Sequence, residues 1–132
     1  MKSTPPTHSP QVNFHRQDDD ILIGKKGLRE WKDVIGKTPF YLYDRFSISN
    51  NIESLRTSLP STVKIHYAIK ANPNPSVVSF ISDLVDGCDV ASHQELLLAL
   101  SSGYERRHIS IAGPGKSDSE LKAAITANIT LH

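Results

Sequence analysis

The sequence predicts an α/β fold with a parallel sheet, of the kind found in (β/α)8 barrels. Four short apolar segments recur every 21 or 22 residues, with centres at Tyr67, Asp89, Ser110 and Leu131. Segments of about ten residues with helical spacing of apolar positions lie between them. This alternation predicts parallel strands joined by right-handed crossovers. The spacing alone fits both a doubly wound sheet and a barrel.

The alternation of side chains within each strand favours the barrel. In the strand at 63–70 one face is bulky and apolar and the other is small or polar: Ile65, Tyr67 and Ile69 against His66, Ala68 and Lys70. The strands at 88–92 and 108–113 repeat the pattern. A doubly wound sheet needs bulky apolar side chains on both faces, because helices cover both. A barrel needs them on the face toward its helices, and its functional groups lie inside, at the C-terminal mouth.

The first 60 residues lead into this repeat. Residues 1–20 are rich in Pro, Ser and Thr, lack periodic apolar positions and are predicted to form a disordered tail. Residues 21–60 are predicted to be an N-terminal strand-and-helix region that leads into the barrel. Its elements are a short strand, a short helix, an aromatic strand (PFYLYD) and a longer helix, at 21–24, 28–36, 39–44 and 45–59.

Residues 61–132 are predicted to be the first βα units of the barrel, which is incomplete. After the strand at 63–70, strands at 88–92, 108–113 and 129–132 alternate with helices at 75–84, 93–103 and 118–128. The helix starts carry capping signals: Asn74 before Pro75, and the capping boxes Ser92 to Glu95 and Ser117 to Glu120.

Composition narrows the classes of protein. The chain has 132 residues, 38% hydrophobic and 22% charged, and a net charge of +1. No basic stripe predicts nucleic-acid binding, and no apolar run approaches the roughly 20 residues of a membrane span. A single cysteine, Cys88, fits a reducing compartment. We therefore expect a cytoplasmic protein with no nucleic-acid partner, no membrane and no metal site.

Lys70 is the strongest candidate for chemistry. The alternation places it on the inner face, near the barrel mouth, where partial desolvation frees an amine for attack on a carbonyl. The structural alternative is a lysine at a strand end that simply reaches solvent. For Cys88 we expect a small buried hydrophobe, for His66 a packed and hydrogen-bonded histidine, and for residues 113–116 a turn that is not a P-loop.

Four blocks in the same order resemble one family. YAIKANPN (67–74) resembles the cofactor-lysine motif of the fold-type III pyridoxal phosphate (PLP) enzymes, in the ornithine/diaminopimelate decarboxylase branch. TPFYLYD (38–44), GCDVASHQEL (87–96) and AGPGKSDSEL (112–121) are similar to further blocks of that family. The resemblance implies the N-terminal half of a PLP-binding TIM-like barrel of the alanine racemase/decarboxylase type, truncated within its fourth strand.

The resemblance also implies a site and a reaction. Lys70 would form the internal aldimine, a Schiff base with PLP, and serve as the catalytic residue. Asp89 would lie near the cofactor, and Ala68 would leave room beside the lysine. Glu95 matches a family glutamate, although its capping box is a competing role. The full-length enzyme would be a homodimeric carboxy-lyase, and this chain a fragment with little activity alone.

Three readings of the function stay open at this point. The first is decarboxylation of an amino acid or an amino-acid conjugate, with the Gly-Pro-Gly-Lys loop leaning toward larger conjugated substrates. The second is an amino-acid racemase on the same barrel, against which the Pro-x-Lys loop argues. The third is a non-catalytic decarboxylase-like regulator, against which the presence of Lys70 argues.

Overall fold

The computed structural model describes residues 14–113 and 115–132. The chain divides into two compact units, one up to Ser47 and one from Ile48 onward. Helix α2 (Arg45–Ser58) runs across this boundary and confirms the helix predicted at 45–59. The part of the predicted tail at residues 1–13 lies outside the described residues.

The first unit contains a small antiparallel sheet followed by a helix. Its elements, in chain order, are β1 (Arg16–Gln17), β2 (Asp20–Ile23), β3 (Lys26–Gly27) and α1 (Leu28–Ile35). The predicted tail includes residues 16–20, but here these residues form β1, a two-residue turn and the first residue of β2, and β1 and β2 pair as a hairpin. Asp18 and Asp19 both take positive φ, 50° and 62°, as a two-residue hairpin turn requires. Aspartate tolerates this region better than most residues.

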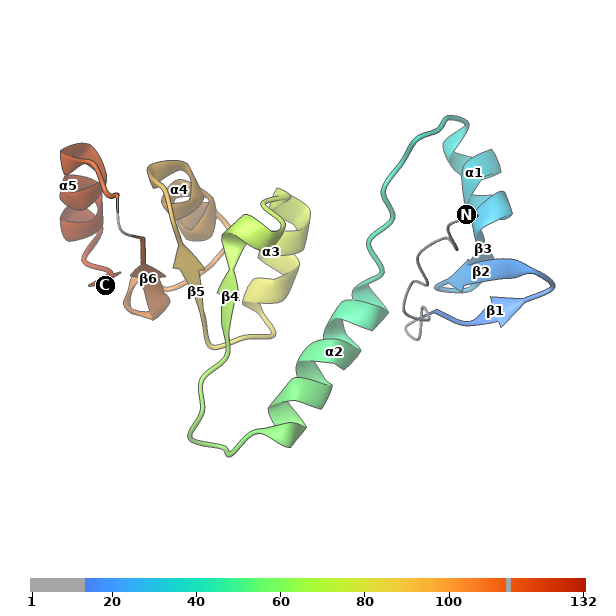
Figure 1. The fold of residues 1–132 in the computed structure, drawn as a ribbon, viewed down its shortest axis with the longest axis horizontal. Helices are drawn as coiled ribbons and strands as arrows, with labels where there is room; N and C mark the ends of the chain where they lie inside the picture. The colour runs from blue at the N-terminus through green and yellow to red at the C-terminus, as the bar shows by residue number, and fades with distance from the viewer. Residues whose placement is uncertain (1–13, 114) are drawn as a thin grey trace, which may run out of the picture. The chain divides into compact units, whose positions relative to one another are not determined.

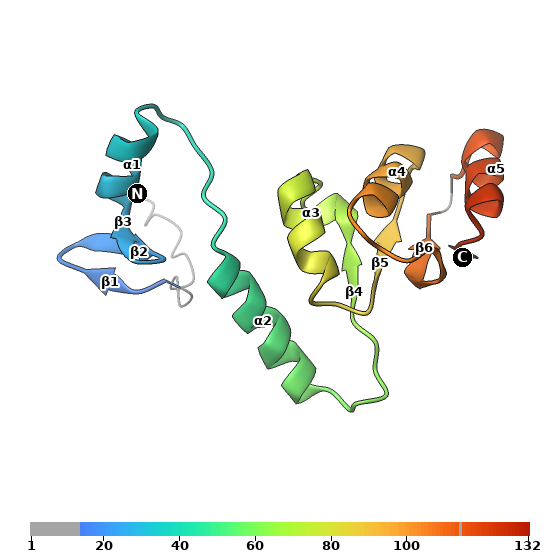
Figure 2. The ribbon, with the colours of Figure 1, turned by 180° about the vertical axis from the view of Figure 1, so that it is seen from behind.

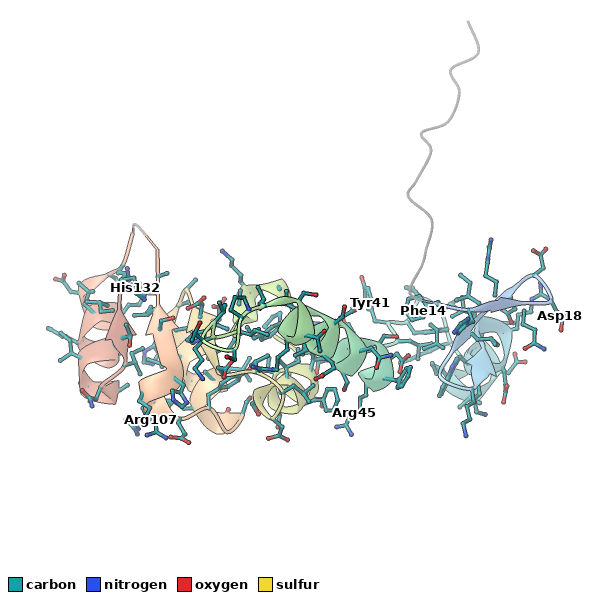
Figure 3. All side chains as sticks on the ribbon, turned by 90° about the horizontal axis from the view of Figure 1, so that it is seen from below. Phe14, Asp18, Tyr41, Arg45, Arg107 and His132 are labelled. Atoms are coloured by element: carbon teal, nitrogen blue, oxygen red, sulfur yellow. The ribbon has the colours of Figure 1, made fainter. Side chains whose placement is uncertain are left out.

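The aromatic strand predicted at 39–44 is not formed. Residues 40–44 have no regular secondary structure, and the strands of the described residues all pair elsewhere. Tyr41 is 86% exposed (Figure 3) and its ring stacks on that of Tyr43 with centroids 6.5 Å apart. A strand exists only with a hydrogen-bonded neighbour, and an aromatic pattern cannot show whether that neighbour is present.

The second unit is a four-stranded parallel sheet in chain order. Its strands are β4 (His66–Ala68), β5 (Gly87–Val90), β6 (Ile109–Ile111) and β7 (Thr130–Leu131). Its helices after α2 are α3 (Pro75–Ser82), α4 (His93–Ser101) and α5 (Asp118–Ala127), with short 3-10 turns η1 (Ile69–Ala71) and η2 (Arg106–His108). Figure 1 shows these βα units following one another, and Figure 2 shows the same row from behind.

The arrangement of the helices confirms the predicted fold class. Helix α4 contacts both α3 and α5, so the three helices lie on one face of the sheet. Strand order follows chain order without a switch point. A doubly wound sheet would place helices on both faces, whereas successive units of a (β/α)8 barrel have this order and this single covered face.

The core lies between the sheet and these helices, on the face that alternation predicted. Strand and turn residues that point toward the helices are fully or almost fully buried: Ile69, Cys88, Val90, Ile109 and Ile111. Helix residues that meet them are Val78, Leu96, Ala99, Ala124 and Ala127. The opposite face of the sheet is thereby left for polar groups.

The predicted helix caps are present, with one difference. The Asn74 side chain accepts the N–H of Ser76, and Ser117 and Glu120 form a reciprocal capping box. Ser92 accepts the N–H of Glu95, as predicted.

The difference concerns Glu95. Its carboxylate reaches back to the N–H of Ala91 at 2.8 Å and not to that of Ser92. Its structural role at the start of α4 is confirmed, but the backbone N–H that donates to it belongs to Ala91, one residue earlier than the capping box predicts.

Asp86, just before β5, joins three segments at the N-terminal end of the sheet. Its carboxylate accepts the N–H of Ile65 at 2.9 Å and pairs with Arg56 at 3.1 Å and Lys64 at 3.3 Å. The hydrogen bond from Ile65, followed by those from Arg56 and Lys64, lowers the pKa of Asp86 from 3.8 to about 2, against the opposing effect of burial. The charged carboxylate therefore fastens α2 and the start of β4 to β5.

We expect Asp86→Asn to lower the free energy of unfolding by about 1.5–3 kcal/mol at neutral pH, because hydrogen bonds to charged groups contribute this much. The folded-state pKa is depressed, so the stabilisation is complete above about pH 4 and is lost as the pH falls through about 2. Urea midpoints of the wild type and the variant, compared across this range, check the prediction. A gap between them that does not narrow in acid would contradict it.

Candidate functional site

A row of residues crosses the sheet on the face away from the core. Parallel pairing aligns one residue from each successive strand in this row: Ala68, Asp89, Ser110 and Thr130. Residues paired across neighbouring strands point to the same side of a sheet. The structure therefore brings the predicted site residues Ala68 and Asp89 side by side.

The carboxylate of Asp89 is held by its neighbours on this face. The Ser110 hydroxyl donates a hydrogen bond to Asp89 Oδ1, and His66 Nδ1 lies 3.9 Å from the same oxygen. The Asp89 side chain is 47% exposed, so it keeps access to solvent. His66, expected to be packed, is exposed, and it pairs with Gly87 on β5.

Lys70 stands at the C-terminal end of β4, on a turn and not within the strand. The strand predicted at 63–70 is shorter in the structure: β4 ends at Ala68, and residues 69–71 form the 3-10 turn η1. Ile69 is completely buried while Lys70 is exposed. The predicted separation of the two side chains is thus confirmed, although the backbone that produces it is helical. A primary amine at this point is open to a ligand.

Two other candidates have structural explanations. Cys88 is completely buried, and this burial, with the charge of Asp89, raises the pKa of its thiol to about 12. The thiolate needed for nucleophilic attack is therefore scarce at neutral pH. Lys116 donates hydrogen bonds to the carbonyl oxygens of Gly113 at 2.7 Å and His132 at 2.5 Å, at the end of β6.

Two residues that contact Asp89 or the lysine turn were not named as site residues from the sequence. Ser110 could have been found, because alternation places it on the same face as Asp89. Tyr67 could not, because its ring belongs to the core face; only the structure shows its hydroxyl bonded to the carbonyl of Asn72 at 3.1 Å. Within residues 14–113 and 115–132, no three His, Cys, Asp or Glu side chains gather as a metal site would need. None of the helices in the same residues is long and apolar enough to cross a membrane.

Comparison with known proteins gives consistent findings. Residues 45–132 match the pyridoxal binding domain of pyridoxal-dependent decarboxylases. The chain is 35% identical over 124 residues to diaminopimelate decarboxylase of Aquifex aeolicus, which covers 94% of this chain and 29% of that protein. It is 35% identical over 89 residues to the Staphylococcus aureus 2-[(L-alanin-3-ylcarbamoyl)methyl]-2-hydroxybutanedioate decarboxylase, covering 67% of this chain and 22% of that protein.

A solved structure shows the same likeness in three dimensions. A crystal structure of an Aquifex aeolicus protein superposes with a TM-score of 0.81 at 34% identity, over 90% of this chain and 29% of that one. The chain thus spans under a third of the length of these relatives. The family match covers two thirds of the chain and includes Lys70, Ala68 and Asp89. This chain belongs to the pyridoxal-dependent decarboxylases and carries part of their pyridoxal binding domain.

Proposed function

We propose that this chain supplies the lysine half of a pyridoxal phosphate site in a carboxy-lyase that acts on an amino acid or an amino-acid conjugate. The observation that carries the proposal is the exposed amine of Lys70 at the C-terminal end of β4, beside the row that contains Ala68 and Asp89. Similarity to decarboxylases of diaminopimelate and of an alanine conjugate supports this substrate class.

The residues present fit the cofactor in their chemistry. An aldehyde needs a primary amine, and Lys70 offers one that is exposed. Ala68, two residues before it, has the small side chain that leaves space on the same face. Asp89 adds a carboxylate whose orientation Ser110 fixes. Pyridoxal phosphate, when bound, supplies an electron sink for the bond that is broken.

Each residue has a definite task in this proposal. Lys70 would hold the cofactor through its Nζ. Asp89 keeps negative charge on the sheet face where a cationic group would be bound, and Ser110 prevents the carboxylate from turning away. The buried core behind Ile69 excludes water from the helix side of the turn. The protein thereby contributes positioning and electrostatics to the reaction.

The test is release of CO2. The complete gene product is incubated with pyridoxal phosphate and with diaminopimelate, ornithine, lysine or a citryl-alanine conjugate, and both CO2 and the product amine are measured. We expect equal amounts of both from at least one substrate. Exchange of the α-proton with loss of optical activity but without CO2 would instead identify a racemase. Cofactor binding without either reaction would identify a regulator.

We also propose a cytoplasmic location and a homodimer for the complete protein. The single cysteine, buried at Cys88, suits a reducing compartment. Several large apolar side chains are exposed in the described residues, among them Ile125 at 72% and Phe46 at 71%. Surfaces of this kind are commonly covered by other parts of a protein or by a second subunit.

A further inference from the structure

The turn that carries Lys70 is short and needs support from outside. The turn η1 has three residues, and at its end the N–H of Asn72 donates to the carbonyl of Ile69 at 3.1 Å. A single 3-10 turn of this length is intrinsically weak. The lysine side chain itself is long and rotatable, so the backbone of the turn decides which region its amine can reach.

Tyr67 provides that support from the strand below. Its hydroxyl donates to the carbonyl oxygen of Asn72 at 3.1 Å, across the turn. The Tyr67 ring packs against the hydrophobic core, and its residue pairs with Cys88 in the sheet. The bond therefore connects the far end of the turn to a ring with few rotatable bonds that packs against the hydrophobic core.

Asn72 continues the support toward α3. Its side-chain oxygen accepts the N–H of Asn74 at 3.1 Å, and the Asn74 side chain in turn accepts the N–H of Ser76 at 3.0 Å. Asn72 is itself extended, with φ −157° and ψ 100°, as is usual for a residue before proline. The segment after Lys70 is thus held at one end by Tyr67 and at the other by the start of a helix.

We propose that Tyr67 is a positioning residue for Lys70: its hydroxyl, through the carbonyl of Asn72, holds the turn η1 in the conformation that presents the lysine amine. The inference rests on the proposed function for the role of Lys70. It also rests on the hydrogen bond from the Tyr67 hydroxyl to the carbonyl of Asn72, which ends the turn that carries Lys70. A displacement of about 1 Å at a reacting group can cost about 10²-fold in rate.

The protein contains a matched control in Tyr104. This tyrosine is buried in the same core, yet its hydroxyl has no hydrogen-bond partner within residues 14–113 and 115–132. Tyr67→Phe and Tyr104→Phe therefore remove the same atom from the same core, but only the first removes a bond to the lysine turn.

The experiment compares the two variants by amide exchange and by labelling. Exchange at Asn72 reports the turn, and borohydride fixation of pyridoxal phosphate, mapped by peptide mass spectrometry, reports Lys70 against the exposed Lys122. For Tyr67→Phe we expect roughly three- to tenfold faster exchange at Asn72, as expected for one lost hydrogen bond, and a lower ratio of labelling at Lys70 to Lys122. Tyr104→Phe should change neither.

Three outcomes would overturn the inference. In the first, Tyr67→Phe shows the same amide exchange and labelling ratio as the wild type, and in the second, both variants change these quantities equally. The third outcome is that Tyr67→Phe speeds amide exchange across the whole sheet and not only at the turn. The proposed function fails separately. If Lys70 of the wild type is labelled no more than Lys122, the lysine has no special role, and exchange at Asn72 still decides whether Tyr67 holds the turn.

Discussion

Replacing Lys70 with alanine is expected to remove specific attachment of pyridoxal phosphate and, in the complete protein, to lower CO2 release by at least about 10²-fold. A misplacement of only about 1 Å at a reacting group can cost that factor, and the substitution removes the group altogether. Lys70 is exposed on η1 and so contributes little to the core. The loss should therefore occur without a change in the urea midpoint.

Two further variants separate chemistry from charge. Lys70→Arg keeps a cation of similar reach but has no amine that can attack an aldehyde at neutral pH, so it should fail in the same way as alanine. Lys122→Ala removes an exposed lysine from α5 and should retain full labelling at Lys70. Labelling is measured by borohydride fixation and peptide mapping. If Lys70→Arg still releases CO2 and pyridoxal phosphate is attached to another lysine, the proposed role of Lys70 is wrong.

Much of this fold is predictable because its signals are local. Helix caps such as Asn74 and Ser117 depend on side chains within three residues of the helix start, and the sequence displays them directly. The strand repeat of 21 or 22 residues predicts parallel order, since no other arrangement brings successive βα units back to one sheet edge. Alternation then predicts which strand faces carry Ile109 and Ile111 into the core.

The structure differs from the prediction where a strand or turn depends on another segment of the chain. The aromatic run at 39–44 has strand propensity but no neighbouring strand among the described residues. Asp18 and Asp19 fall within the predicted disordered tail, although they form the turn of a hairpin whose second strand begins at the next residue, Asp20. Strand β4 ends at Ala68, and residues 69–71 form the 3-10 turn η1 before Pro73. Strand propensity alone does not show at which residue the strand gives way to the turn.

The site was predictable to the extent that it follows from alternation. Ala68 and Asp89 lie on the side of the sheet expected of them, and Ser110 follows by the same rule, whereas Lys70 lies beyond the strand end on η1. The hydrogen bond that supports the lysine turn could not be predicted from alternation, because it starts from a side chain on the core face of β4. The hydroxyl of Tyr67 reaches over the strand end to Asn72, and this depends on the exact path of the turn.

Gly87 is the position where the spacing of the sheet tolerates no side chain. It opens β5 and pairs with His66 on β4. A Cβ atom built on Gly87 would overlap the carbonyl oxygen of His108 and would lie 2.8 Å from both Cε1 and Nε2 of His66. The imidazole can rotate away, but the carbonyl belongs to the backbone that leads into β6. A side chain here must therefore push β5 and β6 apart.

We expect Gly87→Ala to lower the free energy of unfolding by about 3 kcal/mol, the upper part of the usual range for overpacking, because a backbone atom blocks the added methyl group. Gly115→Ala is the matched control, since nothing lies within 4 Å of its Cβ position and its φ is outside the left-handed region that favours glycine. That change should be neutral or stabilise by about 0.4–1 kcal/mol through the unfolded state. Urea unfolding followed by circular dichroism gives both values.

The contribution of His66 can be separated with a double variant. His66→Ala removes the imidazole and leaves the carbonyl of His108 in place, so Gly87→Ala should remain costly when it is introduced into His66→Ala. If the double variant is as stable as His66→Ala alone, the imidazole and not the spacing of β5 and β6 excludes the side chain. In that case the glycine serves the polar face that carries Asp89, because its absence of a side chain is what allows His66 to lie beside that carboxylate.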